Sequence, residues 1–382
     1  MYSSGTTGQP KCIVHSAGGS LIQHLKEHQL HTNIKPTDVV FYYTTCGWMM
    51  WNWLVSVLAS EATIVLYDGS PFFSSPSILL DIAEREKISI FGVSAKYISA
   101  IEKQGIQPVK THRLEHMHTI LSTGSPLTHG SFQYIYRCFN PSIQLSSISG
   151  GTDILSAFVA GNPCLPVYAG EIQCKTLGMD VQIWSDSGES LNEIKGELVC
   201  VNSFPSAPIY FWNDPGDKKY KKAYFEKFTD VWCQGDYGEI TSNGGIVIYG
   251  RSDAVLNPGG VRIGTAEIYR QVEKFETITD SVCVGQKWYE DTRVILFVVL
   301  RTGESLSDEL ILDIKNRIRM ETTPRHVPAK IIPVKDIPRT ISGKTVELAV
   351  RNLIHGEEIK NRDALANPES LEYFKDLEEL KI

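Results

Sequence analysis

Apolar and polar positions alternate in two different ways along residues 39–155. Runs rich in β-branched and aromatic residues predict strands, and segments with apolar positions three or four apart predict helices between them. The predicted strands are 39–45, 63–67, 88–93, 119–122 and 143–148, and the predicted helices are 49–60, 78–86, 95–103 and 130–138. Such alternation is typical of a parallel sheet covered by helices, whose ligands bind at the carboxyl ends of the strands.

The pattern changes after residue 160. Short strands at 196–201 and 244–249 stand between glycines, and Asn243-Gly244 is typical of a hairpin turn. Beyond Arg251 a compact α+β unit is predicted, with helices at 265–275, 307–320 and 346–354 and strands at 293–300 and 330–334. We therefore expect an α/β protein with an α/β sheet subdomain at 1–160, a β-rich subdomain at 161–252 and a smaller α+β domain at 253–382.

The composition is that of a globular protein. Of 382 residues, 42% are hydrophobic and 21% charged, which excludes disordered, collagenous and coiled-coil classes. The net charge of −7 argues against general nucleic-acid affinity, which needs a basic face. No apolar run reaches the roughly 18 residues of a membrane helix, so no membrane partner is expected. The eight cysteines form no CxxC pair, which predicts reduced, mostly buried thiols of a cytosolic protein.

The segment from Tyr2 to Lys11 concentrates groups that bind phosphate. Glycines let backbone N–H groups approach an anion closely, hydroxyls add donors, and a lysine supplies positive charge. These residues are Ser3, Ser4, Gly5, Thr6, Thr7, Gly8 and Lys11. The spacing is not that of a Walker-type loop, because Pro10 stands where the second glycine would be. The segment predicts a phosphate cradle; a polar, flexible terminus is the alternative.

Two further loops place a basic residue beside glycine. Thr340–Thr345 contains Gly343-Lys344-Thr345 but lacks the Walker glycine, and by itself it indicates a loop with a solvated lysine. Gly250-Arg251-Ser252-Asp253, followed by 257–262, stands where the composition changes. Its glycines suit a domain joint and its arginines suit phosphate or ribose, although a structural linker with a salt bridge fits the same residues.

Two acidic motifs follow expected strands. In Gly150-Gly151-Thr152-Asp153, a hydroxyl beside a carboxylate can hold Mg²⁺ together with waters and substrate phosphates. In the segment 234–238, Asp236 can accept from both hydroxyls of a ribose. Each motif by itself is equally compatible with a tight turn.

Taken in order, the five motifs resemble those of the adenylate-forming acyl-CoA synthetases, the family that also contains luciferases and nonribosomal peptide adenylation domains. The segment from Tyr2 matches the family's phosphate loop, Gly250–Asp253 its hinge and Ser342-Gly343-Lys344 its carboxy-terminal catalytic loop. The resemblance runs from residue 2 to about 355. It implies that 1–252 is the latter part of an amino-terminal AMP-binding domain and that 253–382 is a mobile carboxy-terminal domain.

Other segments resemble the short-chain branch of this family, which acts on acetate and acetoacetate. They are Ser149–Asp153, Phe211–Pro215, Leu256–Tyr269 and Ala366–Glu369. Acetate-specific relatives place a tryptophan near Gly150, so glycine here implies a deeper acyl pocket, with Gly151 and Trp48 also at its wall. The resemblance thus implies an acid–thiol ligase that joins acetoacetate to CoA, in ketone-body use for lipid synthesis. A synthetase for another short-chain acid is the alternative.

The family first joins a carboxylate to ATP, which gives an acyl-adenylate and pyrophosphate, and the CoA thiol then displaces AMP. Negative charge on the α-phosphate requires preorganised cations and donors in the transition state, not a covalent nucleophile. The resemblance implies ATP, Mg²⁺ and CoA as ligands. It assigns the cradle, from Ser3 to Lys11, to the β- and γ-phosphates.

The resemblance also assigns the remaining site residues. Thr152 would touch the α-phosphate and Asp153 the Mg²⁺, although the family usually has the longer Glu at that position. Lys344 would bridge the acyl carboxylate and the α-phosphate until the small domain turns about Asp253. The other implied contacts are Gly124, Ser125 and Pro126 at the adenine, Asp236 and Arg251 at the ribose, and Gly260 and Arg262 at CoA.

Three clusters offer rival chemistry. His24-Leu25-Lys26-Glu27-His28 fits the H-x-x-E-H pattern of inverted zinc peptidases, but with His31 it is better explained as a solvated helix face. A second histidine cluster lacks a complete ligand set and predicts a surface loop; it consists of His112, His116 and His118. The tryptophans Trp48, Trp51 and Trp53 are expected in the acyl-pocket wall or the core.

The resemblance to this family changes what the length of the chain implies about its domains. The family carries a long segment before its phosphate loop, whereas here the loop begins at residue 2. We therefore expect a large domain that lacks its amino-terminal part, with exposed sheet edges and an unfilled core. The alternative to an active ligase is a nonenzymatic fragment or isoform that keeps residual nucleotide binding.

Overall fold

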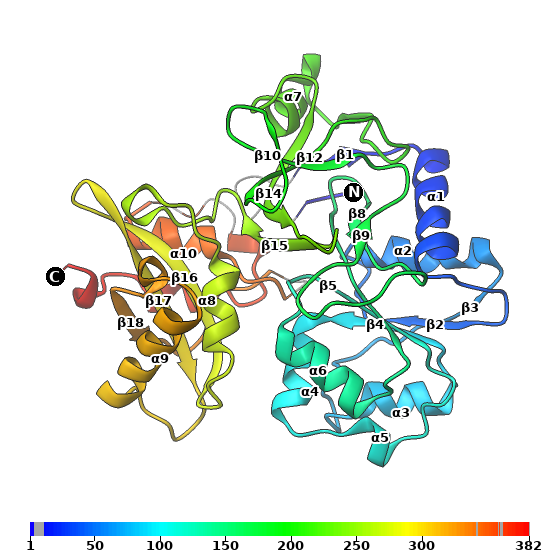
Figure 1. Ribbon diagram of the computed structural model, residues 1–382, viewed down its shortest axis with the longest axis horizontal. Helices are drawn as coiled ribbons and strands as arrows, with labels where there is room; N and C mark the ends of the chain where they lie inside the picture. The colour runs from blue at the N-terminus through cyan, green and yellow to red at the C-terminus, as the bar shows by residue number, and fades with distance from the viewer. Residues whose placement is uncertain (4–10, 341–342, 358, 360–361, 382) are drawn as a thin grey trace. The chain divides into compact units, whose positions relative to one another are not determined.

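The structure is a computed structural model that describes residues 1–3, 11–340, 343–357, 359 and 362–381 (Figure 1). The described residues fall into two compact units. Unit 1 comprises Met1–Ser3, Lys11–Gln234 and Gly238–Ile248, and unit 2 comprises Gly235–Tyr237 and the described part of Tyr249–Ile382. The boundary at residue 253 and the mobility of the smaller domain stay predictions.

Unit 1 contains the parallel sheet that the alternating pattern predicts. Its strands are β2 (Val39–Tyr42), β3 (Thr63–Val65), β4 (Ile90–Ser94), β5 (Thr119–Thr123) and β6 (Gln144–Ser147). They lie in the order β3-β2-β4-β5-β6, and every neighbouring pair is parallel. The predicted α/β fold is confirmed.

Helices cover both faces of this sheet (Figure 1). They are α2 (Met50–Ser56), the 3₁₀ turn η2 (Val57–Ser60), α3 (Ile78–Arg85), α4 (Ala95–Lys103), α5 (Pro108–Thr111) and α6 (His129–Cys138). Because side chains alternate along a strand, Phe41 packs with α3, α4 and α6 on one face while Val40 packs with α2 on the other. Burial on both faces explains the continuous apolar runs in the sequence.

Helix α1 (Ala17–Lys26) continues into a π-helical turn, η1 (Glu27–His31). This segment carries the H-x-x-E-H pattern, and the expectation of a solvated face is wrong: His24, His28 and His31 are 2%, 0% and 3% exposed. His24 Nδ1 lies 2.8 Å from Ser56 Oγ, and its Nε2 lies 2.7 Å from the Leu155 carbonyl oxygen. Burial lowers the pKa of both His24 and His28 below the ordinary value.

Glu27 in the same turn is a buried carboxylate surrounded by donors. The Trp53 indole N–H donates to Glu27 Oε2 at 3.0 Å, the Ala157 N–H donates to Oε1 at 3.2 Å, and the Ser156 hydroxyl also donates to Oε1. The Lys26 ammonium lies 3.7 Å from Oε1. These contacts compensate the loss of hydration and tie the first helix to α2 and to the strand that starts at Ser156.

The rest of unit 1 is β-rich. A three-stranded antiparallel sheet joins β7 (Ser149–Gly151), β8 (Ser156–Ala160) and β9 (Cys174–Lys175), and β1 (Ile13–Val14) pairs with β13 (Tyr210–Phe211). A second sheet has the order β11 (Ser190–Leu191), β10 (Val181–Trp184), β12 (Gly196–Cys200), β14 (Trp232–Ile240) and β15 (Ile246–Arg251). The turn at Asn243-Gly244 is confirmed, because Gly244 has φ +77° and its N–H donates to the Thr241 carbonyl at 2.9 Å. Helix α7 (Lys218–Phe225) lies between β13 and β14 in the chain.

Unit 2 is an α+β unit around a three-stranded sheet. Its elements are α8 (Thr265–Val272), β16 (Ile278–Trp288), β17 (Asp291–Leu300), α9 (Asp308–Glu321), β18 (Lys330–Pro333) and α10 (Glu347–Ile354). β17 pairs antiparallel with β16 and parallel with β18. α8 and α9 pack on the face that carries Leu296, and α10 packs on the face that carries Phe297.

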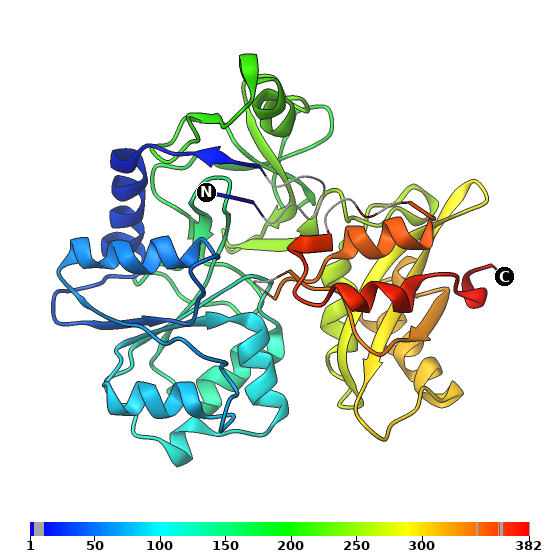
Figure 2. The same ribbon diagram turned by 180° about the vertical axis from the view of Figure 1, so that it is seen from behind.

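Short 3₁₀ turns connect these elements and close the chain. They lie at Pro215–Asp217, Pro258–Gly260, Pro324–His326, Arg362–Ala364, Pro368–Phe374 and Glu378–Leu380. The turn at Pro368–Phe374 runs beside α10, as Figure 2 shows from behind. Its Phe374 ring meets Phe297 edge-on, with the ring centroids 4.9 Å apart, so this turn is part of the core of unit 2.

Four chemical features bear on function. Within the described residues, no helix is both long and apolar enough to cross a membrane, and no group of three or more His, Cys, Asp or Glu side chains is placed to hold a metal ion. All eight cysteines are free thiols, and half of them are buried. The cluster His112, His116 and His118 lies before β5, where His116 and His118 are exposed as predicted.

Candidate active site

The ends of the predicted phosphate cradle are held together. Ser4, Gly5, Thr6, Thr7 and Gly8 lie outside the described residues. On either side of them, Tyr2 and Cys12 form an antiparallel bridge. The Lys11 N–H donates to Ser3 Oγ at 2.9 Å, and the Ser3 N–H donates to the Lys11 carbonyl at 3.1 Å. Ser3 and Lys11 are therefore neighbours at the base of the predicted loop.

Lys11 also meets the acidic residue predicted for Mg²⁺. Its ammonium lies 2.7 Å from Asp153 Oδ1, and the two side chains are 32% and 18% exposed. The Tyr224 hydroxyl donates to the same carboxylate oxygen, and Lys11 Nζ lies 4.9 Å from the centroid of the Tyr224 ring. Tyr224 was missed by the sequence analysis, because an aromatic residue on the apolar side of a lysine-rich helix signals only packing.

Close packing explains why position 150 is a glycine, an explanation that the sequence did not predict. It lies in β7, and a Cβ atom there would stand 2.1 Å from the Ser156 carbonyl oxygen of β8. At Gly151 a Cβ would stand 2.9 Å from Gln234 Nε2. These glycines therefore let β7 approach its neighbours closely. Their role in the depth of an acyl pocket stays a prediction.

Gly150→Ala is expected to destabilise the protein, because its Cβ meets rigid strand backbone. Such overpacking costs about 1–3 kcal/mol, which corresponds to a fall in Tm of several degrees. Gly18→Ala in α1 is the matched control, because nothing lies within 4 Å of a Cβ at that position and alanine is the better helix former. Differential scanning fluorimetry compares the two variants; equal Tm values for both would contradict the packing explanation.

Two predicted residues meet at the carboxyl ends of the parallel strands. Gly124 follows β5 with φ +96°, and a Cβ there would stand 3.8 Å from the ring of Trp48, which follows β2. Trp48 is half-buried and packs edge-on against Tyr42, with the ring centroids 6.0 Å apart. Ser125 is half-buried and Pro126 exposed. This is the sheet edge where ligands of parallel sheets bind.

The other two tryptophans of the same helical segment differ from Trp48. Trp53 is 3% exposed and belongs to the core beneath α2, and the core was one of the two predicted locations. Trp51 is half-buried.

Thr152, the residue predicted to touch the α-phosphate, is half-buried. It stands beside Asp153, so its hydroxyl is close in the chain to the carboxylate that Lys11 contacts.

Asp236 and Arg251 are brought together within unit 2. The expectation that Asp236 follows a strand is wrong, because it lies inside β14. The preceding Gly235 has φ +86°, and its carbonyl accepts from the Ser252 N–H at 2.9 Å. Arg251 Nη1 donates to Asp236 Oδ1 at 3.0 Å, with the arginine side chain 47% exposed. A guanidinium and a carboxylate are thus held side by side.

The predicted hinge residue is anchored through its backbone. Arg351 of α10 donates from Nη1 to the Asp253 carbonyl oxygen at 2.8 Å. Arg251 Nε lies 4.0 Å from Asp253 Oδ1. In this conformation the segment after β15 is therefore tied to α10.

The residues predicted for CoA lie in the next loop. Gly260 has φ +77° and is exposed, as is Arg262. The Arg262 guanidinium lies 6.0 Å from the centroid of the Tyr237 ring. The preceding Gly259 N–H donates to Asp291 Oδ1 at 2.8 Å, which fixes the loop against the start of β17.

Lys344 is presented on a tight turn. The Thr340 N–H donates to the Lys344 carbonyl at 2.9 Å, and the Lys344 N–H donates to Thr340 Oγ1 at 3.1 Å. Gly343 has φ +81°, a conformation that favours glycine. The Lys344 residue is exposed, whereas Ser342 lies outside the described residues.

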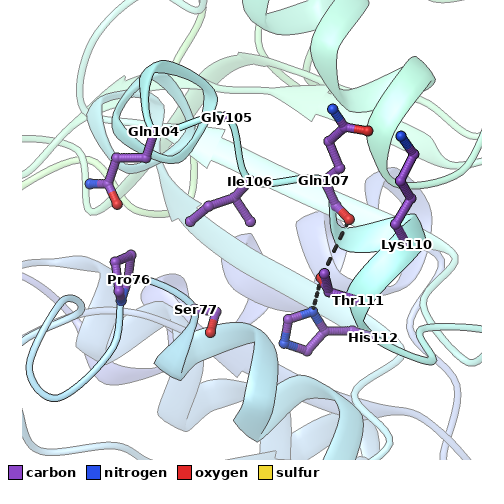
Figure 3. A pocket seen from close by; sticks show the side chains of 9 residues that line it. All are labelled: Pro76, Ser77, Gln104, Gly105, Ile106, Gln107, Lys110, Thr111 and His112. Atoms are coloured by element: carbon purple, nitrogen blue, oxygen red, sulfur yellow. Dashed lines mark hydrogen bonds between the residues drawn. The ribbon is translucent and has the colours of Figure 1, made fainter.

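A cavity of about 450 Å³ lies elsewhere in unit 1, at the ends of α4 and α5 (Figure 3). The Thr111 hydroxyl there donates to the Gln107 carbonyl at 3.3 Å and lies 2.8 Å from His112 Nδ1. The lining residues are Pro76, Ser77, Gln104, Gly105, Ile106, Gln107, Lys110, Thr111 and His112. Apart from His112 of the second histidine cluster, none of these residues belongs to a motif of the sequence analysis.

Comparison with known proteins places the chain in a family. The family model described as AMP-binding enzyme matches residues 1–205. The acetoacetyl-coenzyme A synthetase of Rhizobium meliloti (strain 1021) is 58% identical over 381 residues, and that of Gallus gallus is 51% identical over 383 residues. Both matches cover 100% of this chain, but 59% and 57% of the relatives.

A solved structure agrees with these matches. The structure of acetoacetyl-CoA synthetase from Streptomyces lividans superposes with a TM-score of 0.93 at 42% identity, over 100% of this chain and 59% of that chain. The chain therefore belongs to the AMP-binding enzyme family, and the family and fold predicted from the five motifs are confirmed. It spans rather more than half the length of the relatives it matches.

Proposed function

We propose that this protein is an ATP-dependent ligase that forms acetoacetyl-CoA from acetoacetate and CoA. The reaction runs through acetoacetyl-adenylate with release of pyrophosphate, and AMP leaves when the CoA thiol attacks. The observation that carries the reaction class is the Lys11–Asp153 pair at the base of the phosphate cradle. The choice of acetoacetate rests on the names of the relatives that match the whole chain.

The proposed phosphate and metal contacts come from the predicted cradle and from residues of unit 1. Lys11 and the cradle hold the β- and γ-phosphates, and Thr152 the α-phosphate. Asp153 fits Mg²⁺ as a hard oxygen ligand, and Mg²⁺ sites of this kind commonly combine one carboxylate with substrate phosphates. When bound, Mg²⁺ neutralises phosphate charge. Gly124, Ser125 and Pro126 line the adenine, and Trp48 the acyl group.

Unit 2 supplies the other proposed contacts. The Asp236 carboxylate accepts from the ribose hydroxyls, and Arg251 beside it holds that carboxylate in place. Lys344 stabilises the charge that develops between the acyl carboxylate and the α-phosphate. Rotation about Asp253 then exchanges Lys344 for Gly260 and Arg262, which face CoA in the second half-reaction. The partners proposed are these small molecules, and the location is the cytosol, which the eight free thiols support.

The experiment is pyrophosphate release by this chain with ATP, Mg²⁺ and acetoacetate. Acetoacetate-dependent release, with a higher kcat/KM than for acetate, is the expected result. Greater kcat/KM for acetate or another short-chain acid contradicts the proposed substrate and leaves the reaction class intact. No release from folded protein that still binds Mg²⁺·ATP selects the alternative, a nonenzymatic chain with nucleotide binding.

A further inference from the structure

Tyr224 has a hydroxyl at the candidate site and a ring in the core. It is 1% exposed and lies on the buried side of α7. Its ring stacks on Trp232 with the centroids 3.9 Å apart and meets Phe211 edge-on at 5.7 Å. These contacts fix the ring between α7, the start of β14 and β13. A phenylalanine would satisfy the same packing, so the hydroxyl needs a separate explanation.

The hydroxyl donates to Asp153 Oδ1, the oxygen that the Lys11 ammonium also contacts. The two donors differ in their freedom. Lys11 reaches Asp153 through a flexible stem that is 32% exposed, whereas the phenol is carried by a rigid, buried ring. When the Lys11 side chain turns from Asp153 to a phosphate, the hydrogen bond from Tyr224 to Asp153 remains, because the buried Tyr224 ring does not move. A hydrogen bond to a charged acceptor is also stronger than one between neutral groups.

We propose that Tyr224 is a positioning residue. Its hydroxyl holds the Asp153 carboxylate in its metal-binding orientation, and its ring contacts the Lys11 ammonium above it. This inference rests on the proposed function of Asp153. It also accounts for an aspartate where the family usually has a longer glutamate, since a shorter carboxylate depends more on a fixed orientation. Tyr224 itself does not touch the reacting atoms.

Tyr224→Phe tests the hydroxyl while it keeps the ring packing. We expect the Mg²⁺ concentration for half-maximal Mg²⁺·ATP binding to rise about tenfold, because a charge-assisted hydrogen bond is lost. The same shift is expected for half-maximal pyrophosphate release, with the KM for acetoacetate unchanged. Titration calorimetry without any acid substrate measures the binding, so the result does not depend on turnover.

The matched control is Tyr220→Phe on the same helix. Tyr220 belongs to the same aromatic cluster, with its ring 5.4 Å from that of Tyr224, but its hydroxyl donates to the Pro208 carbonyl at 3.1 Å. We expect no change in the Mg²⁺ dependence for this variant. An equal shift in both variants would mean that Tyr224 acts only through packing and would overturn the proposal.

A double-mutant cycle with Asp153→Asn isolates the interaction itself. If Tyr224 acts through Asp153, Tyr224→Phe has no further effect on Mg²⁺·ATP binding once the carboxylate is gone. A full, additive effect in the Asp153→Asn background would overturn the proposal even if Tyr224→Phe lowers stability. If binding behaves as expected but no acid supports pyrophosphate release, the proposed function fails and the positioning role stands.

Discussion

Replacing Lys344 with alanine is expected to lower the rate of adenylate formation strongly while leaving the formation of thioester from supplied acetoacetyl-adenylate intact. Lys344 is exposed, and its backbone is held by hydrogen bonds to Thr340. Removal of one preorganised electrostatic contact to a transition state lowers the rate by about a hundredfold to a thousandfold. Pyrophosphate release measures the first half-reaction, and CoA-dependent AMP release from the adenylate measures the second.

Lys287→Ala is the control for this experiment, because Lys287 is an exposed lysine of β16 in the same unit. Both half-reactions of this variant are expected to match the parent protein. A comparable loss of both half-reactions in Lys344→Ala would refute the division of labour between the two steps. It would show instead that the turn around Lys344 is needed throughout the reaction.

Glu27→Ala is expected to lower the free energy of unfolding by about 3–5 kcal/mol, because removal of a buried charge leaves its partners without compensation. The donors left behind are the Trp53 indole N–H, the Ala157 N–H and the Ser156 hydroxyl, together with the nearby Lys26 ammonium. The corresponding fall in Tm is about 10 °C. Thermal unfolding followed by circular dichroism measures it.

Glu115→Ala serves as the comparison, since Glu115 is exposed in the turn before β5. Surface substitutions of this kind usually change stability by less than about 0.5 kcal/mol. If Glu27→Ala were as stable as Glu115→Ala, the buried network around η1 would not support the fold. The H-x-x-E-H pattern would then need another explanation.

The regular elements could be predicted where the apolar pattern is periodic. Helix α4 begins and ends at the predicted residues, Ala95 and Lys103, because its apolar face repeats cleanly. Strand β16 (Ile278–Trp288) was missed, because Thr279, Asp280 and Gly285 interrupt its apolar run. Pairing with β17 along its whole length makes it a strand, and such a non-local contact leaves no local signature.

The H-x-x-E-H motif shows that a sequence pattern does not determine whether a polar helix face is buried. Helical spacing places His24, Glu27 and His28 on one side of the chain, and this much the sequence predicts. Whether such a polar side meets water or other polar groups depends on what packs against it. Here Ser56, Trp53 and Ser156 supply the partners, from segments that no spacing rule connects to α1.

The sequence by itself determined the α/β class, the order of the five motifs and hence the family. These follow from residue identities and from periods of two and about 3.6 residues, which are local properties. Only the tertiary structure decided that Lys11, Asp153 and Tyr224 meet, although 142 and 71 positions separate Asp153 from the other two. Folding brings such a group together by packing aromatic side chains and strands that are far apart in the chain. A site residue that is positioned by this packing can therefore be identified only from the tertiary structure.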